Sequence, residues 1–344
     1  MRRAQAHRCR ERQQRTGLHT SRPTRATASL RALAAIALVA AGGLFWLTTF
    51  RWASQRPAAM PPMGSAAQCK ACHPDVYAEW QRSQHSQAMT GVGVRTRMDL
   101  APSPRDCLPC HAPQSVVMAK RTEDVKARAE NRHSGVDCLS CHWRGDGVAA
   151  GRTVGDAPCR PVATPAVGTS AFCGLCHVSI FGDWQASPAA KQGHSCAHCH
   201  MPTVARKSRP GRSHLCFGGH DEDLVQSAVA MDADITPDRV LVRVRNLCPA
   251  HNMPGERHHR VLTLHYRRVG ADGNIVDERR IEIKGVVPFK GESSSDKIKP
   301  GQTETYRFDP PAPGERFDAW LKYKLYPWQL DVSARSLSHV HSPD

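Results

Sequence analysis

The chain has 344 residues, enough for two domains of ordinary size, and a net charge of +16 at pH 7. Aromatic residues make up only 6% of it, too few to fill a large core in a chain of this length. The 14 cysteines and 19 histidines instead indicate metal or cofactor chemistry. Half of the net charge lies in residues 1–31, which hold nine arginines and one acid. This concentration favours a role in membrane topology and argues against a nucleic-acid partner.

An uncharged segment follows the basic tail. Ala32 to Phe50 are 19 residues without a charge, close to the ~20 that span a bilayer as a helix. By the positive-inside rule, the tail is expected to stay in the cytoplasm and everything after Arg51 to be exported. We therefore expect a single-pass inner-membrane protein whose main part lies in the periplasm. A signal peptide cleaved near the alanines of residues 58–67 is the alternative.

The pattern Cys-x-x-Cys-His occurs five times in the middle of the chain. Two thiols at this spacing reach the two vinyl groups of one haem and form thioethers, and the adjacent histidine lies under the iron as its proximal ligand. The expected attachment residues are Cys69, Cys72 and His73; Cys107, Cys110 and His111; Cys138, Cys141 and His142; Cys173, Cys176 and His177; and Cys196, Cys199 and His200.

Zinc and disulfides are the alternatives for paired cysteines. Zinc ribbons also use Cys-x-x-Cys pairs, but zinc does not require a histidine directly after the second cysteine, and all five motifs have one. A disulfide framework accounts for paired cysteines outside the cytoplasm but not for the fixed position of the histidines. The sequence therefore predicts five covalently bound c-type haems, whose roughly ten propionates would offset the remaining positive charge.

The spacing of the motifs is short, and part of it is repeated. The motifs begin 38, 31, 35 and 23 residues apart, so the haems must lie near one another and replace the missing hydrophobic core. The segments after the first and fourth motifs are related by an offset of 104 residues, and each is predicted to be a short helix with two aromatic residues on one face. The corresponding positions are Tyr77 and Phe181, Trp80 and Trp184, Gln81 and Gln185, Ser83 and Ser187, and His85 and Ala189.

The ordered set of motifs resembles the multihaem cytochrome c superfamily. The run Cys-x-x-Cys-His-Pro-x-x-Tyr-x-x-Trp-x-x-Ser-x-His at 69–85 carries the resemblance, and it is followed by Cys-His-Ala-Pro at 110–113 and Cys-His-Met-Pro at 199–202. His-x-x-x-Gly-Gly-His at 214–220 and Ala-His-Asn-Met-Pro-Gly at 250–255 complete it. That superfamily includes the tetrahaem cytochrome of ammonia oxidisers, the pentahaem nitrite reductases and the hydroxylamine oxidoreductases. The resemblance covers about residues 68–260.

The resemblance implies the histidines that complete the coordination of the irons. A second histidine makes a haem a closed, low-potential electron carrier, whereas an empty position makes it a site for substrate. The distal ligands implied by the resemblance are His85, His214, His220 and His251, and His133, five residues before Cys138, is our choice for the fifth. The remaining histidines outside the tail are expected to be bystanders or surface residues: His194, His198, His258, His259, His265, His339 and His341.

The sequence departs from the catalytic members of the superfamily. The nitrite reductases replace the proximal histidine of their working haem with lysine, and no motif here has that replacement. We also find no clear counterpart of the tyrosine that hydroxylamine oxidoreductases crosslink to their catalytic haem. Of the cysteines left over, Cys216 and Cys248 each lie two or three residues from an expected distal histidine, and a disulfide between them is a hypothesis. Cys159 has no assigned role.

The carboxy-terminal third has the alternation of β-strands. Residues 240–245 alternate valine with leucine or arginine, and 261–266 and 281–283 are further expected strands. Gly270 to Asn274 marks a hairpin between them, and Tyr306 to Phe308 and Trp320 to Tyr326 indicate two more strands. We expect a small antiparallel β-sandwich whose first loop carries His251 back to a haem.

Five segments follow from these patterns. They are a basic cytoplasmic tail (1–31), a transmembrane helix (32–50), a linker (51–67), a mostly helical and irregular pentahaem domain organised around its haems (68–237) and a β-sandwich (238–344). The expected function is electron transfer between a membrane donor and a periplasmic or outer-membrane acceptor, with redox proteins as partners. A quinol dehydrogenase acting on membrane quinol and a reductase of nitrogen or sulfur oxyanions remain as alternatives.

Overall fold

The computed structural model describes residues 25–54, 63–101, 103–151, 155–206, 210–255, 260–285 and 296–342. The chain divides into two compact units, Met1–Ala59 and Met60–Asp344. Most of the predicted basic tail, part of the predicted linker, and the three residues Cys9, His258 and His259 lie outside the described residues.

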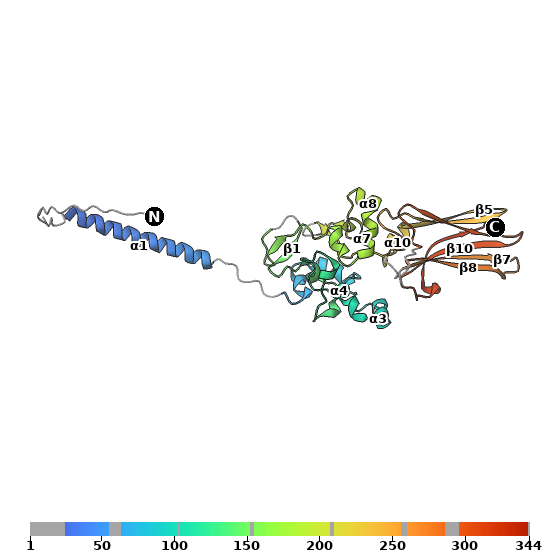
Figure 1. Cartoon of the computed structure of the whole chain (residues 1–344), viewed down its shortest axis with the longest axis horizontal. Coiled ribbons are helices and arrows are strands. Elements are labelled where there is room, and N and C mark those ends of the chain that lie inside the picture. The colour runs from blue at the N-terminus through green and yellow to red at the C-terminus, as the bar shows by residue number, and fades with distance from the viewer. Residues whose placement is uncertain are drawn as a thin grey trace, which may run out of the picture. The chain divides into compact units, whose positions relative to one another are not determined.

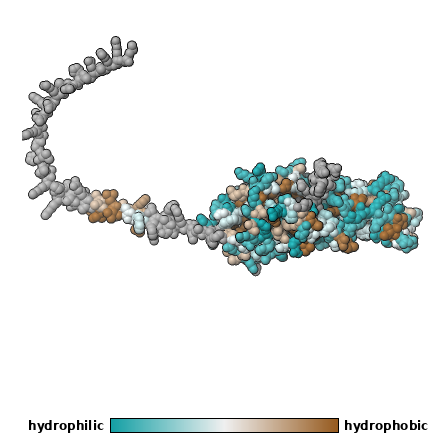
Figure 2. All heavy atoms as spheres, turned by 60° about the horizontal axis from the view of Figure 1, so that its bottom comes forward, coloured by the Kyte–Doolittle hydropathy of each residue, from teal (hydrophilic) through white to brown (hydrophobic). Residues whose placement is uncertain are grey.

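The described part of the first unit is the helix α1 (Arg25–Ser54), which covers the predicted transmembrane segment (Figure 1). Its described side chains are exposed and include apolar residues such as Leu38 and Phe45, and part of this segment is brown in Figure 2. Within the described residues, however, no helix is long and apolar enough to cross a membrane, so a transmembrane helix is not supported. Alanine and glycine occupy eight of the 19 uncharged positions, and they contribute less apolar surface than leucine or isoleucine would.

The second unit begins with a motif region (residues 63–228) made of short helices (Figure 1). All five Cys-x-x-Cys-His motifs lie on or directly beside a short helix: η1 (Ala66–Ala71), α4 (Leu108–His111), α5 (Cys138–His142), α6 (Ser170–Gly174) and α9 (Cys196–His200). The other helices are α2 (Pro74–Arg82), α3 (Val92–Asp99), α7 (Val178–Gln185), α8 (Pro188–Lys191), α10 (Glu222–Ser227), η2 (Pro104–Cys107), η3 (Thr122–Asp124) and η4 (Arg132–Ser134). The strands β1 (Val148–Ala150) and β2 (Pro161–Ala163) pair in parallel, and β3 (Thr203–Val204) and β4 (Gly211–Arg212) pair antiparallel.

The predicted repeat is present as two equivalent helices, α2 and α7. Tyr77 and Trp80 lie with ring centroids 5.3 Å apart, and Phe181 and Trp184 with centroids 5.7 Å apart. Each tryptophan donates its indole N–H to a backbone carbonyl of a later segment, Trp80 to Val136 and Trp184 to His194. Helix α2 therefore holds the segment just before the third motif, and helix α7 holds the segment just before the fifth.

The motif region has little hydrophobic core of its own. Among the described residues, its buried cluster consists of Val116, Val125 and Leu175, with Phe172 and Cys176 packed against it. The low aromatic content predicted this shortage. Most of the order in this region comes from backbone hydrogen bonds and caps, such as the side chain of Asp137, which accepts from the N–H of Ser140 at the start of α5.

The rest of the second unit is a β-domain (residues 229–342) of two antiparallel sheets. One sheet has the order β11-β10-β7-β8 and the other β5-β6-β9. The strands are β5 (Val229–Thr236), β6 (Arg239–Asn246), β7 (Val261–Val269), β8 (Ile275–Lys284), β9 (Thr303–Phe308), β10 (Arg316–Lys324) and β11 (Arg335–His341), with η5 (Asp331–Ser333) before the last strand. The β-structure begins nine residues before the expected position 238, and β11 was not predicted.

Both sheets bury residues in one shared core, as a sandwich requires. Val240, Val242 and Val244 of β6 face inward, as their alternation predicted, and they are fully buried. They belong to the same cluster as Leu264 and Tyr266 of β7. The phenol of Tyr266 donates to the carbonyl of Asp309, so its one polar atom is satisfied inside the core.

Polar contacts join the β-domain to the motif region around the loop after β6. Asp183 of α7 accepts hydrogen bonds from the side chains of Asn252 and Lys297, each at 3.1 Å. The N–H of Ala189 donates to the carbonyl of Pro249. The loop that contains His251 is thus held against the helix that follows the fourth motif.

Candidate functional site

The motif histidines are oriented by hydrogen bonds to the backbone. Nδ1 of His111 lies 2.7 Å from the carbonyl of Ala88, and Nδ1 of His142 lies 2.8 Å from that of Ala149. A carbonyl oxygen only accepts, so each Nδ1 carries the proton and Nε2 keeps its lone pair. His200 makes the same contact with the carbonyl of Phe217. This arrangement fixes the ring orientation and tautomer that a metal-ligating histidine needs.

Three motif histidines each face one of the expected distal histidines. The ring centroids are 6.2 Å apart for His85 and His177, 6.3 Å for His142 and His214, and 6.2 Å for His200 and His251. Two imidazoles on opposite sides of one metal ion, with bonds of about 2 Å, have centroids roughly 6 Å apart. The residues present therefore fit a haem iron between each pair.

The facing histidines are oriented in the same way as the motif histidines. Nδ1 of His214 lies 2.9 Å from the carbonyl of Arg212, and Nδ1 of His251 lies 3.1 Å from that of Asn252. Both rings therefore keep Nε2 available for a metal. For the pair of His142 and His214, this leaves one bare nitrogen on each of the two facing rings, whereas the ring of His251 also hydrogen-bonds to Cys248.

Burial keeps most of these rings neutral, which is the form that binds a metal. It lowers the pKa of His85 to about 4, and the charges of His177 and His214 act in the same direction. Burial is also the main cause that lowers the pKa values of His142, His200 and His214. For His251, burial acts downward, but a hydrogen bond with Cys248 and the charge of that thiol raise the pKa overall.

A buried ion pair supports the loop that carries His214. The carboxylate of Glu79, on α2, accepts from Arg206 at 2.7 Å and from the backbone N–H of His214 at 2.7 Å. The side chains of Arg206 and Glu79 are only 9% and 15% exposed. Although burial acts to raise it, these hydrogen bonds hold the pKa of Glu79 below its usual range. Sequence analysis did not single out Glu79, because its partners lie 127 and 135 positions away.

The five motifs also contact one another through their thiols. A hydrogen bond joins Cys69 of the first motif to Cys138 of the third, and another joins Cys110 of the second to Cys176 of the fourth. A third joins Cys173 of the fourth motif to Cys196 of the fifth. The thiol of Cys141 in the third motif acts electrostatically on the fourth. All five motifs are therefore linked in one connected set.

Four expected ligands are not among these ring pairs. Within the described residues, His73 and His111 face no histidine at such a distance. His133 lies on η4, and the side chain of the preceding Asn131 donates to the carbonyl of Gly64, five residues before Cys69, at 3.5 Å. His220 instead faces Tyr326 with centroids 6.4 Å apart. In the described stretches, no group of three or more His, Cys, Asp or Glu side chains could hold a metal ion.

The cysteines outside the motifs do not form the disulfide that the sequence suggested. Cys216 and Cys248 are both free, so the disulfide between them was a wrong prediction. The two thiols have different surroundings. Cys216 acts electrostatically on Cys141, and Cys248 hydrogen-bonds to His251. Cys159 is free and half-buried.

The predicted bystanders that the structure describes lie outside the three ring pairs. His194 and His198 stack on each other with centroids 4.3 Å apart. His265 lies 3.5 Å from Asp331, and His339 stacks on Trp320. His341 donates to the carbonyl of Ser342 from the end of β11. The contacts of His265, His339 and His341 lie within the β-domain.

Comparison with known proteins finds one family model and one similar whole structure. Residues 68–143, which hold the first three motifs, match the family model of cytochrome c554 and c-prime. The structure is similar to that of a penta-heme cytochrome c552 from Thermochromatium tepidum, with a TM-score of 0.59 and 18% sequence identity over 81% of this chain and 98% of that one. At this identity the match shows the fold. No curated protein matches the chain significantly.

Other solved structures match only a third of the chain. A β-glucuronidase from Bacteroides uniformis matches 33% of this chain and 12% of its own, with 10% identity and a TM-score of 0.16. An endonuclease/exonuclease/phosphatase from Beutenbergia cavernae matches 33% and 23%, with 14% identity and a TM-score of 0.17. Scores this low carry no functional argument.

Proposed function

We propose that this chain is a multihaem c-type cytochrome that transfers single electrons through five covalently attached haems on the outer side of a bacterial inner membrane, and the matches of residues 68–143 and of the fold support this proposal. The observation that carries the proposal is the set of three facing histidine pairs, whose centroids are 6.2 to 6.3 Å apart. When bound, haem iron supplies a one-electron couple, and a second histidine closes the iron to substrates.

The proposed ligand pairs follow from which rings lie together. We assign His85 to His177, His214 to His142, and His251 to His200, each motif histidine being proximal and its partner distal. The contact between Asn131 and Gly64 favours His133 for the first motif. His220 then remains for His111. Three proximal histidines, His111, His142 and His200, have a backbone carbonyl at Nδ1. Each would present Nε2 to iron without a change of tautomer.

The proposed path for electrons follows the contacts between motifs. The first and third motifs touch, the second and fourth touch, and the fourth also touches the fifth. Groups attached through these thiols would lie side by side, so an electron could pass from one to the next without a long gap. The protein's part is to hold these groups in fixed positions and to exclude water from them.

The partners and the location belong to the same proposal. The thioether motifs and the basic tail of residues 1–31 support a periplasmic position, a membrane donor such as quinol and a redox protein as acceptor. Attachment to the inner membrane rests on the sequence of the amino-terminal segment alone. Osmotic shock would leave an attached protein with the membranes until detergent is added. Release of a soluble protein that begins near residue 60 would contradict attachment.

One observation favours a second candidate, a reductase of a small oxyanion. Within the described residues, His111 faces no histidine ring, and His220 faces Tyr326 instead. An iron held only by His111 would be open to a ligand such as nitrite.

Mass spectrometry and EPR separate these possibilities. The intact mass of the denatured protein should contain five haems, and Cys138→Ala with Cys141→Ala should remove one. The EPR spectrum of the oxidised protein should show five low-spin haems if all are closed. A spectrum with four low-spin centres and one high-spin centre that binds nitrite would favour the reductase proposal over the electron-carrier proposal. A protein with zinc and no haem would refute both.

A further inference from the structure

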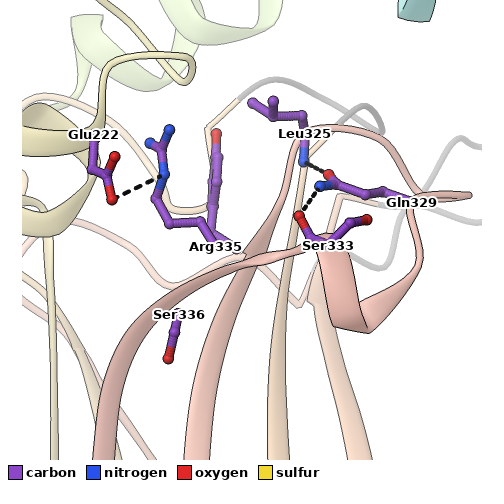
Figure 3. Close-up of a pocket in the computed structure, with 7 residues that line it drawn as sticks. Glu222, Leu325, Gln329, Ser333, Arg335 and Ser336 are labelled. Carbon is purple, nitrogen blue, oxygen red and sulfur yellow. Dashed lines mark hydrogen bonds and ion pairs between the residues drawn. The ribbon is translucent and has the colours of Figure 1, made fainter.

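A polar pocket lies where the end of the β-domain meets α10. It has a volume of about 440 Å³ and is lined by Glu222, Tyr323, Leu325, Gln329, Ser333, Arg335 and Ser336. In Figure 3, Arg335 extends from β11 toward Glu222 on α10, and Gln329 lies between Leu325 and Ser333. The side chain of Gln329 accepts from the N–H of Leu325 at 2.7 Å and donates to the carbonyl of Ser333 at 2.6 Å. This wall of the pocket is therefore already hydrogen-bonded.

The guanidinium of Arg335 is not satisfied in the same way. Its Nη1 is buried and has no hydrogen-bond partner among the described residues. Its ion pair with Glu222 is long, 3.8 Å from Nε, and the side chain of Glu222 is 72% exposed, so that pair contributes little. A buried N–H of a cation without an acceptor is costly, and an anion is its best partner.

A second arginine, Arg260, lies beside the pocket-lining residue Leu325. Arg260 donates from Nη1 to the carbonyl of Leu325 at 2.6 Å. A Cβ added to Gly219 would lie 2.5 Å from the phenol oxygen of Tyr323 and 2.8 Å from Nε of Arg260. Glycine at this position is what lets the tyrosine and the arginine approach the turn before His220.

We propose that Arg335 and Arg260 form a binding site for an oxyanion or carboxylate at this junction. The pocket contains one guanidinium with an unpartnered N–H and one solvent-exposed carboxylate, and Arg260 lies beside its lining residue Leu325, so positive charge is in excess. The planar fork of arginine suits the two oxygens of a carboxylate or a phosphate. The anion comes either from solution or from a haem propionate. The second source rests on the proposed function, in which His220 is a ligand of the haem attached at His111.

Calorimetric titration of the purified holo-protein with inorganic phosphate at low salt tests the first source. Wild type should bind phosphate, and Arg335→Gln should weaken binding about tenfold or more, the loss expected for one charged hydrogen-bonding partner. Arg335→Lys keeps the charge but not the planar guanidinium, and its phosphate affinity should lie between those of wild type and Arg335→Gln. Arg267→Gln, at a guanidinium that pairs with Glu278 on the exposed part of β7 and β8, is the matched control and should bind like wild type.

Redox titration of the same variants tests the second source. If a propionate occupies the site, phosphate does not bind, and Arg335→Gln lowers the midpoint potential of one haem because a positive charge that stabilises the reduced form is lost. Arg267→Gln should then shift no haem. The proposal is overturned if Arg335→Gln changes neither phosphate binding nor any single potential.

Two further measurements keep the result interpretable. If Arg335→Gln loses β-structure by circular dichroism, Arg335→Lys and Arg260→Gln carry the same comparison, and the absence of an effect in both overturns the site. The haem count from intact mass is read independently. Phosphate binding that depends on Arg335 in a protein with fewer than five haems would contradict the proposed function and leave the anion site standing.

Discussion

The motif region and the β-domain are ordered by different means. Among the described residues, the larger buried cluster contains seventeen side chains of the β-domain, including Tyr266, Phe317 and Leu264, together with Val225 of α10, whereas the separate cluster of the motif region contains three. The β-domain excludes water with its own side chains. The motif region places its chain by helix caps, backbone hydrogen bonds and pairs of facing rings. The difference teaches that one part of this chain carries its own driving force for folding and the other needs the cofactor to supply it.

Removal of the haems should have the largest effect on the difference in order between the motif region and the β-domain. In a chain produced without haem attachment, residues 63–228 should lose their order because apolar macrocycles no longer fill the space between the motifs. Residues 229–342 should stay folded. Limited proteolysis followed by mass spectrometry would then yield a protected carboxy-terminal fragment from the haem-free chain and no such fragment from the holo-protein. Equal protection of both regions without haem would remove the basis of the comparison.

A substitution at the junction tests how far the two regions depend on each other. His251→Ala should convert one low-spin haem to high-spin, raise its potential and create a site for carbon monoxide or nitrite. It should also loosen the attachment of the β-domain to the motif region, since a ligand bond from this loop joins the two regions. EPR and redox titration measure the first effect, and proteolysis the second. His265→Ala, in β7 beside Asp331, is the control; an unchanged low-spin count in His251→Ala would show that the ligand assignment is wrong.

A cavity in the β-domain should affect only that domain. Leu264 is fully buried, and Leu264→Ala should lower the free energy of unfolding of the β-domain by about 2–5 kcal/mol. Denaturant unfolding followed by tyrosine and tryptophan fluorescence measures this loss. Leu330→Ala, at a side chain that is 71% exposed, should cost less than about 0.5 kcal/mol. A matching shift in the haem spectrum of Leu264→Ala would mean that the β-domain core is coupled to the motif region.

A smaller and pH-dependent effect is expected at Asp331. Burial acts to raise its pKa, but hydrogen bonds from Arg280 and Lys324 hold the pKa below its usual range. A depressed pKa stabilises the fold above the ordinary carboxyl value of about 3.9 and ceases to do so as the pH falls through the folded value. Asp331→Asn should therefore cost about 1–2 kcal/mol at pH 7, and the difference from wild type should vanish in strong acid. A constant difference between pH 7 and pH 2.5 in denaturant titrations would contradict this.

The sequence predicted the elements whose cause is local. The Cys-x-x-Cys-His motifs, the helices at Tyr77–Trp80 and Phe181–Trp184, and the inward valines of β6 all follow from spacing within a few residues, and the structure has them. Strand β5 was missed because Asp232 and Asp234 occupy its exposed positions and weaken its apolar signal. Strand β11 was missed because its alternation involves histidine and serine more than apolar residues.

Pairings between distant segments could not be predicted from the sequence. His85 lies near the first motif in the chain but faces His177 of the fourth, and His214 faces His142. Such contacts depend on how the whole region packs, which no local spacing encodes. The same holds for Glu79, which supports the His214 loop across more than a hundred residues. The expectation that these histidines bind iron stays a prediction until the spectra are measured.

The order of the thiol contacts has a consequence for how the protein is made. Cys69 contacts Cys138, and Cys110 contacts Cys176, so each early motif meets a partner 69 or 66 positions later in the chain. At synthesis rates of about 5–20 residues per second, the first segment waits roughly 3–14 seconds for its neighbour. During that interval its attached group has no packing partner. We expect the first motif to pack once the third has been made, and the second to pack once the fourth has been made. From those points on, the packed segments should be less accessible to chaperones and proteases.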